Sequence, residues 1–178
     1  MADSALQLRH PTVEDGLAVW RLVGEAGTLD RNSCYLYLLL CREFADTCVV
    51  AERLGEIEGF VTGFRPPRRP EAWFLWQVGV APQARGQGLA ARMVHFLLER
   101  LAGTGVRWLE TTVSPGNAAS RALFEGVARR LEVPLVEEPL FESRHFPAES
   151  NHEPEPLLRI GPFDSVAARA ARNRLSSA

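Results

Sequence analysis

Hydrophobic and polar positions divide the first third of the chain into one strand and two helices. Alternation over residues 6–9 predicts a short first strand, and Thr12 is a suitable N-cap for a helix over residues 13–25. Residues 34–44 predict a second helix that is apolar on nearly every face. Such a helix is either buried on most sides or covers a ligand.

The middle of the chain predicts most of a sheet. Residues 48–52 and 57–64 form a predicted hairpin, and residues 72–80 form the most apolar strand, which we therefore place at the centre. Gly79 inside that strand indicates a bulge or a close backbone approach. A helix over residues 88–102, a strand over 108–113 and a helix from Asn117 to about residue 130 follow, and the polar stripe expected on the first of these helices is Arg92, His95 and Glu99.

Prolines and charges become frequent after a short strand predicted at residues 133–136. We expect an extended tail from Glu137 with one strand at 157–160, then a segment at 161–178 that is either disordered or a loose helix. Residues 1–160 thus form a single predicted domain. Because strands and helices interleave, we predict an α/β (α+β) fold with a mixed sheet and helices on both faces.

Composition narrows the class of protein. The 178 residues, 46% hydrophobic and 24% charged, suit one globular domain. A net charge of −2 without a long basic run argues against nucleic-acid binding, and the longest apolar run, residues 34–41, is too short for a membrane span. Three widely spaced cysteines and a start without a secretory pattern favour the reducing cytoplasm. The four histidines are scattered, so no metal site is expected.

The strongest motif follows the central strand directly and opens a helix. It reads Gln83-Ala84-Arg85-Gly86-Gln87-Gly88, with Leu89 and Ala90 in the first helical turn. Consecutive backbone N–H groups and a helix N-terminus at one point suit a pyrophosphate. The spacing fits neither a nucleotide P-loop nor the dinucleotide fingerprint, and a plain tight turn is the structural alternative.

The arrangement resembles the GCN5-related N-acetyltransferase (GNAT) family, whose signature Arg/Gln-x-x-Gly-x-Gly/Ala is filled by residues 83–88. Asn117, which begins a helix after a strand and a turn, is similar to a second family landmark. The resemblance covers residues 6 to about 136 and implies splayed central strands and acetyl-CoA as co-substrate. It implies that the cofactor's pyrophosphate lies on the N–H groups from Arg85 to Ala90, that its pantetheine lies along Val78 and Val80, and that Asn117 and Phe124 flank it.

One position departs from the family pattern. Many members carry a tyrosine where this chain has Phe124, and that tyrosine protonates the departing thiolate. Phenylalanine has no proton to give, although a thiol of pKa about 8.5 leaves readily as an anion near neutral pH. Because of this departure, the sequence does not identify the general acid.

Two further segments bear on the acceptor. Residues 29–39, Leu-Asp-Arg-Asn-Ser-Cys-Tyr-Leu-Tyr-Leu-Leu, and the tail from Asn151 with His152-Glu153-Pro154-Glu155 are similar to the branch of the family that acetylates the side-chain (N4) amine of L-2,4-diaminobutyrate in ectoine biosynthesis. The implied partner is a small diamino acid.

The residue chemistry of these segments fits such an acceptor. Carboxylates at Asp30, Glu153 and Glu155 could bind ammonium groups, Tyr35 and Trp76 could wall the aliphatic stem, and the N–H groups near Ser33 could bind the carboxylate. Each has a plainer interpretation: a helix cap for Asp30, a solvated tail for the glutamates and core packing for Trp76.

The family resemblance implies direct attack of the amine on the thioester. The amine must first lose a proton, and the candidate bases are His152, Glu155 and Glu110. Tyr35 could instead donate to the leaving sulfur. A backbone N–H near Val78 would stabilise the developing oxyanion, and a covalent cysteine route is disfavoured because no histidine neighbours a cysteine in sequence.

Other functions remain open at this level. The acceptor could be another small amine or a peptide N-terminus, and Phe124 also suits a non-catalytic protein that binds acyl-CoA. An exposed strand near the C-terminus could pair across a two-fold axis, which would make a homodimer.

Overall fold

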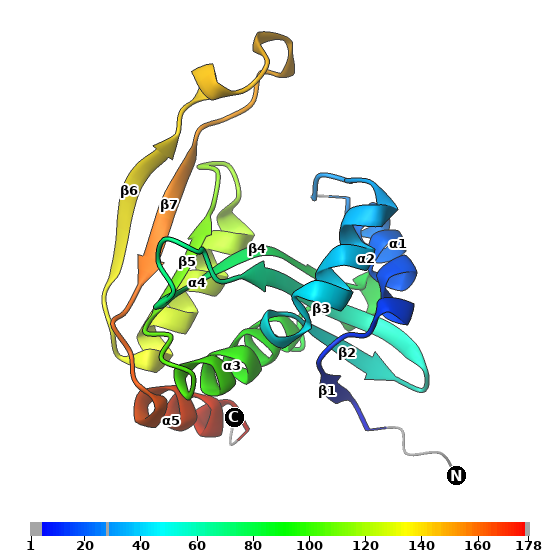
Figure 1. Ribbon diagram of the computed structural model, residues 1–178, viewed down its shortest axis with the longest axis vertical. Helices are drawn as coiled ribbons and strands as arrows, with labels where there is room; N and C mark the ends of the chain where they lie inside the picture. Colours follow the sequence, from blue (N-terminus) through cyan, green and yellow to red (C-terminus); the bar gives the residue numbers. More distant parts are fainter. Residues whose placement is uncertain (1–4, 28, 177–178) are drawn as a thin grey trace.

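One seven-stranded sheet organises the chain in a computed structural model that describes residues 5–27 and 29–176 (Figure 1). The strand order is β1-β2-β3-β4-β5-β7-β6, and every neighbouring pair is antiparallel except β4 and β5, which are parallel. This mixed sheet confirms the predicted fold class. The strands are β1 (Gln7–Arg9), β2 (Val49–Arg53), β3 (Glu56–Phe64), β4 (Ala72–Val80), β5 (Trp108–Thr112), β6 (Leu135–Phe141) and β7 (Glu155–Ile160).

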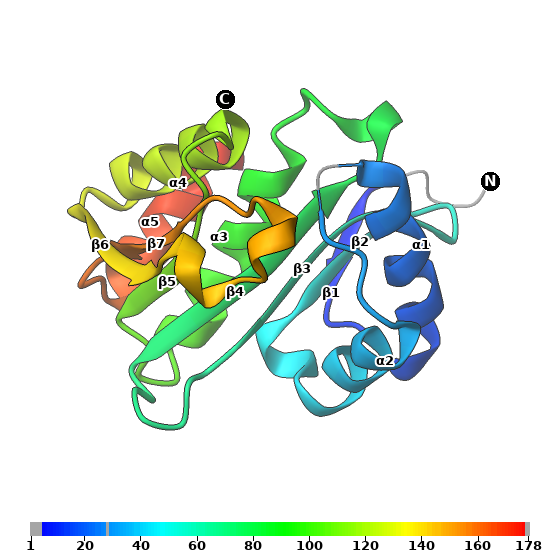
Figure 2. The same ribbon diagram turned by 90° about the horizontal axis from the view of Figure 1, so that it is seen from above.

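Helices cover both faces of the sheet, as predicted (Figures 1 and 2). The helices α1 (Gly16–Ala26) and α2 (Cys34–Glu43) lie on one face, and α3 (Leu89–Ala102), α4 (Ala118–Leu131) and α5 (Ser165–Ser176) lie on the other. Trp73, Phe60, Leu97 and Leu109 are among the fully buried side chains between these layers. In the described part of the chain, the helices are too short or too polar to cross a membrane.

The two parallel strands diverge. Pairing between β4 and β5 is confined to residues 72–74 and 108–110, although β4 continues to Val80. On its other edge, β5 pairs with β7 at residues 109–112, and Figure 1 shows β5 leading away from β4. This confirms the splayed central strands. The outer half of β4 therefore has a partner strand on the β3 side only.

A bulge interrupts β4 within that outer half. Thr62 pairs with Gln77 and Gly63 pairs with Leu75, so Trp76 is the extra residue. The sequence predicted either a bulge or a close approach at Gly79, and the close approach is the one observed there. A Cβ on Gly79 would lie 2.4 Å from the Phe60 ring, so the strand needs glycine at that position.

The polar stripe predicted on α3 is wrong at one position. His95 is fully buried, because α4 and α5 pack against α3 and cover the surface that we expected to face solvent. Helical periodicity shows which residues share one face of a helix, but it does not show how many neighbouring elements cover that face.

The C-terminal region is more regular than predicted. The expected extended tail from Glu137 is a hairpin of β6 and β7, in which Pro139 lies at a register irregularity on the outermost strand. The segment expected to be disordered or loosely helical contains α5, which packs on α3 and α4 through buried Ala168 and Ala171. Alanine leaves room for two helices to approach closely, which local composition alone did not reveal.

Candidate functional site

A backbone cradle follows β4. A short helical turn, Pro82–Ala84, leads to Gly86 and Gly88, whose φ angles of +75° and +70° lie in the left-handed region. No described atom lies within 4 Å of where a Cβ would stand on either glycine, so the space beside the loop is open. The first N–H groups of α3 have no carbonyl partner within the helix. The loop and helix end thus suit an anion such as a diphosphate.

Side chains around this cradle stabilise its shape. The Nε of Arg85 donates to the Val80 carbonyl oxygen at 3.2 Å, and the amide of Gln87 donates to the Gln83 carbonyl oxygen at 3.3 Å. Leu89 is buried and Ala90 is half-buried, which fixes the start of α3 against the sheet. Main-chain groups therefore make up most of the surface that could bind an anion.

Val78 and Val80 lie on the outer half of β4, beyond its last pair with β5. Both side chains are half-buried. An extended, amide-containing ligand could add to the backbone of β4 on this side as a strand would. This is the position at which the predicted pantetheine would lie.

The α4 landmarks differ in their surroundings. The side-chain oxygen of Asn117 accepts a hydrogen bond from the Ser120 N–H at 3.0 Å, so Asn117 caps α4 as predicted. Phe124 is 1% exposed and belongs to the hydrophobic core. A role for either residue beside a cofactor stays a prediction.

The loop between α1 and α2 carries the first group of predicted acceptor residues. Asp30 is exposed, Ser33 is the N-cap of α2, and Tyr35 in the first turn is 68% exposed. The loop is tied to α1, because the indole N–H of Trp20 donates to the Asn32 carbonyl oxygen at 3.0 Å and the Arg31 guanidinium lies 3.7 Å from the centre of the Trp20 ring.

Two buried polar residues that the sequence analysis missed connect this loop to β4. The Tyr37 hydroxyl donates to Gln77 Oε1 at 3.0 Å, and Gln77 Nε2 donates to the Asp30 carbonyl oxygen at 3.1 Å. The Tyr37 ring also stacks on half-buried Trp76, with 6.2 Å between the ring centres. The available signal was a glutamine inside the most apolar strand, since a buried amide requires partners.

The second group lies on the β6–β7 hairpin. The Glu153 carboxylate accepts a hydrogen bond from the Gly116 N–H at 3.0 Å, which ties the hairpin to the turn before α4. The His152 ring stacks on Phe146 at 3.9 Å, and its Nδ1 lies 2.6 Å from the Glu153 carbonyl oxygen. Because a carbonyl only accepts, Nδ1 carries the proton and Nε2 is the acceptor of the neutral ring. Half-buried Glu155 begins β7.

These two groups rise on opposite flanks of the divergence between β4 and β5 (Figure 1). Figure 2, viewed from above, shows the hairpin end and the α1–α2 loop on either side of β4. The segments that carry the predicted residues therefore lie on two sides of the strand that leads to the cradle.

The other candidate side chains, Glu110 and the buried cysteines, lie in surroundings that do not suit catalysis. Glu110 is 1% exposed and lies between Arg69 at 2.9 Å and Arg159 at 3.3 Å, so it links the β3–β4 loop to β7. Burial raises the pKa of Cys41 to about 12 and that of Cys48 to about 11, which keeps both thiols protonated and poor nucleophiles at neutral pH. Among residues 5–27 and 29–176, histidine, cysteine and carboxylate side chains form no metal-binding group.

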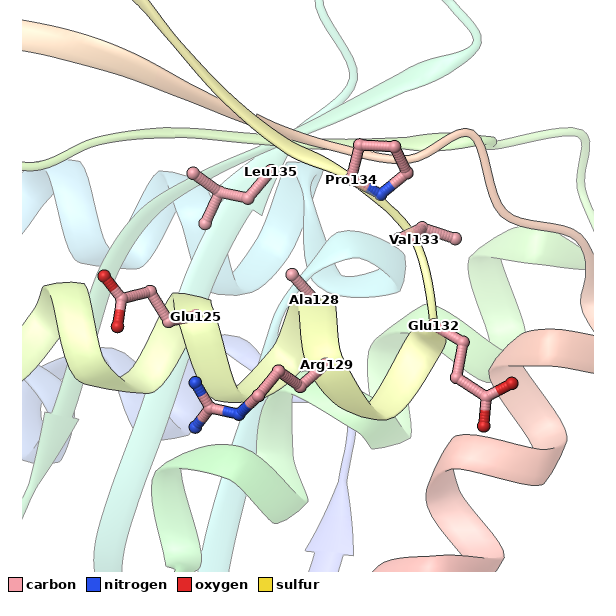
Figure 3. A pocket seen from close by; sticks show the side chains of 7 residues that line it. All are labelled: Glu125, Ala128, Arg129, Glu132, Val133, Pro134 and Leu135. Carbon is pink, nitrogen blue, oxygen red and sulfur yellow. The ribbon is translucent and has the colours of Figure 1, made fainter.

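Two surface grooves lie away from the outer half of β4. One runs between α4 and the start of β6 (Figure 3), lined by Glu125, Ala128, Arg129, Glu132, Val133, Pro134 and Leu135. The other lies beside the β6–β7 hairpin and includes Pro115, Leu140 and Phe141. Neither is lined by a predicted site residue.

Comparison with known proteins agrees with this architecture. The profile of the acetyltransferase (GNAT) family matches residues 17–127. An L-2,4-diaminobutyric acid acetyltransferase from Bordetella parapertussis is 48% identical over 157 residues, which cover 88% of this chain and 84% of that protein. Another from Shouchella clausii is 44% identical over 160 residues, which cover 90% and 89%.

A solved structure is similar over a comparable share of the chain. It is a diaminobutyrate acetyltransferase from Paenibacillus lautus in complex with its substrate L-2,4-diaminobutyric acid and coenzyme A. It has a TM-score of 0.86 and 46% identity, and the match covers 90% of this chain and 96% of that chain. The chain therefore belongs to the acetyltransferase (GNAT) family and, within it, to the family of the L-2,4-diaminobutyric acid acetyltransferases.

Proposed function

We propose that this chain transfers the acetyl group of acetyl-CoA to the N4 amine of L-2,4-diaminobutyrate. The observation that carries the proposal is its likeness, at 46% identity and a TM-score of 0.86, to a protein bound to that diamino acid and coenzyme A. The product is N4-acetyl-L-2,4-diaminobutyrate, and we place the reaction in ectoine biosynthesis, where it serves osmoprotection.

The binding site for acetyl-CoA consists mainly of main-chain N–H groups. When bound, acetyl-CoA supplies an acetyl group activated as a thioester. The N–H groups from Arg85 to Ala90 bind its diphosphate, and the open space beside Gly86 and Gly88 supports this assignment. A backbone N–H of the bulged strand near Val78 donates to the carbonyl oxygen on which negative charge develops.

The acceptor side matches the charges of the diamino acid. Asp30 and Glu155 provide negative charge for its two ammonium groups, and Glu153, which already accepts the Gly116 N–H, adds its second carboxylate oxygen. Tyr35 and Trp76 wall the aliphatic stem. The N–H groups that open α2 after Ser33 bind the substrate carboxylate.

The candidate bases for proton transfer lie on the β6–β7 hairpin. An ammonium has no lone pair, so the reacting amine must lose a proton before it attacks. The Nε2 atom of His152 is free to accept one, because Nδ1 donates to the Glu153 carbonyl oxygen, and Glu155 is the alternative base. Tyr35 is the candidate donor to the leaving sulfur, because Phe124 carries no hydroxyl.

The test is to follow release of free thiol with acetyl-CoA and a panel of amines, and to locate the acetyl group by NMR. We expect L-2,4-diaminobutyrate to have the highest kcat/KM and the acetyl group to be on N4. Faster turnover of lysine, ornithine and peptides would contradict the proposed substrate. Binding of coenzyme A without turnover of any amine would contradict the proposed enzymatic function.

We also propose a homodimer that works in the cytoplasm. The outermost strand, β6, is exposed along most of its length and presents Val136, Leu140 and Phe141, which are 47%, 38% and 46% exposed. An unpaired strand edge with apolar side chains suits pairing with a second copy. The three free cysteines suit a reducing compartment. Light scattering of the full chain tests the dimer, and a monomeric mass at micromolar concentration would contradict it.

A further inference from the structure

Gln77 stands out because it is a polar side chain in the middle of the most apolar strand. It is 6% exposed, and its neighbours on β4 are Trp76, at the bulge, and Val78. Burying an amide is costly unless its donors and acceptor are satisfied. Packing alone would therefore favour an aliphatic residue at this position.

The hydrogen bonds of Gln77 fix how its amide is oriented. The Asp30 carbonyl oxygen can only accept, so the group 3.1 Å from it is the Gln77 NH₂. The Gln77 oxygen is then turned toward Tyr37, whose hydroxyl donates at 3.0 Å. One side chain thus links three elements: β4, α2 and the α1–α2 loop.

The link falls at the place where the two sides of the proposed site meet. On the loop, the residue that accepts the bond is Asp30, whose side chain is exposed, and Asn32 Nδ2 also donates to the same carbonyl oxygen at 3.1 Å. On the strand, Gln77 is next to Val78, where the cofactor is proposed to lie. The Trp20 contacts hold the loop against α1, whereas the Gln77 amide connects the loop to β4.

We propose that Gln77 is a positioning residue that sets the distance between the acceptor's ammonium-binding loop and the acetyl end of the cofactor strand, and so selects the length of the diamino acid. The inference rests on the proposed function. A shift of about 1 Å in the placement of a reacting group can cost on the order of a hundredfold in rate. An acceptor longer by one methylene, such as ornithine, is therefore disfavoured while the loop is held in place.

The test compares three variants with the wild-type chain. Gln77→Met conserves the volume but removes both hydrogen bonds, which leaves the Tyr37 hydroxyl buried without its acceptor. The double variant Gln77→Met/Tyr37→Phe also removes that hydroxyl, so it tests the loss of the loop contact without the orphaned group. Tyr37→Phe alone keeps the bond from Gln77 to Asp30.

We expect both variants that carry Gln77→Met to raise KM for diaminobutyrate by about tenfold and to reduce the preference for diaminobutyrate over ornithine by a similar factor. The affinity for coenzyme A should stay within about twofold, and Tyr37→Phe should lie between these variants and the wild type. Amide hydrogens of residues 29–33 should exchange faster in the double variant. Thr111→Val, which removes a hydroxyl from a β5 residue that is 2% exposed, is the matched control and should change neither constant.

The outcomes separate the two proposals. A wild-type chain that does not acetylate diaminobutyrate overturns the proposed function, whatever Gln77 does. An active wild type together with a folded double variant that keeps both its KM and its length preference overturns the positioning role. An equal loss of kcat/KM for every acceptor also overturns it, because a merely structural residue would act in that way.

Discussion

Residues 78–90 form the cofactor side of the proposed site as one continuous stretch, whereas the acceptor side uses three segments that are far apart in the chain. The cofactor side is the end of β4, a glycine loop and a helix start, and main-chain groups are its proposed contacts. The acceptor side combines the α1–α2 loop, Gln77 and the β6–β7 hairpin. Side-chain hydrogen bonds tie the loop to α1 and to Gln77, and they tie the hairpin to the turn before α4. Local backbone conformation should therefore control cofactor binding, and long-range contacts should control the choice of acceptor.

The largest expected effect is on the cofactor side. Gly86→Asp would place a negative charge beside the bound diphosphate and a side chain at a φ of +75°, and we expect coenzyme A to bind at least about a hundredfold more weakly, as measured by calorimetry. Gly55→Asp is the matched control, because Gly55 has a φ of +83° and similar open space but lies in the turn between β2 and β3.

The control should lose stability from the same backbone strain and keep its affinity for coenzyme A. Equal affinity in the two variants would mean that the glycine loop does not bind the diphosphate, and the contrast between the two sides would fail.

An effect of similar size is expected on the acceptor side, but in a different constant. Glu155→Gln keeps the size of the side chain and removes its charge, so kcat/KM for diaminobutyrate should fall by about a hundredfold while the affinity for coenzyme A is unchanged. Glu138→Gln on the neighbouring strand, where Glu138 is exposed and opposite Leu157, should stay within about twofold of the wild type. A parallel loss of coenzyme A affinity would show that the two sides are not separable.

A smaller effect concerns the stability of the helix that carries the cradle. Burial lowers the pKa of His95 to about 4, the positive charges of Arg130 and Arg174 act in the same direction, and neither ring nitrogen has a hydrogen-bond partner among the described residues. The unfolded chain, with a histidine pKa near 6.5, binds more protons between these values. Stability is therefore full above about pH 6.5 and falls by up to about 1.4 kcal/mol per pH unit as the pH drops toward 4.

The variant His95→Leu should flatten this dependence, and at pH 7 it should be at least as stable as the wild type because it removes two unpaired polar atoms. Urea unfolding across this pH range measures the slope. His145→Gln, at an exposed histidine of the hairpin, should keep the wild-type slope. Identical slopes for His95→Leu and the wild type would contradict the assignment to His95.

Periodicity and turn chemistry predicted the elements that depend on neighbouring residues. The strand Ala72–Val80 and the start of α3 after Gly88 were predicted closely, because a short apolar run and a glycine before a helix are local signals. The N-cap at Asn117 was predicted for the same reason. The strand predicted at 157–160 lies within β7, and the one predicted at 133–136 overlaps the start of β6. The rest of β6 and its pairing with β7 were not predicted, because prolines and charges resemble a loop unless a partner strand is known to lie alongside.

The sequence by itself determined the cofactor side, since a stretch of consecutive residues fixes its own backbone conformation through φ preferences and helix geometry. Only the tertiary structure decided that the bulge lies at Trp76, that α4 and α5 bury His95, and that Gln77 connects β4 to the carbonyl of Asp30. Each of these facts depends on which segments pack together. The sequence around a side chain does not specify which distant group that side chain will contact. These contacts form only when the sheet has assembled.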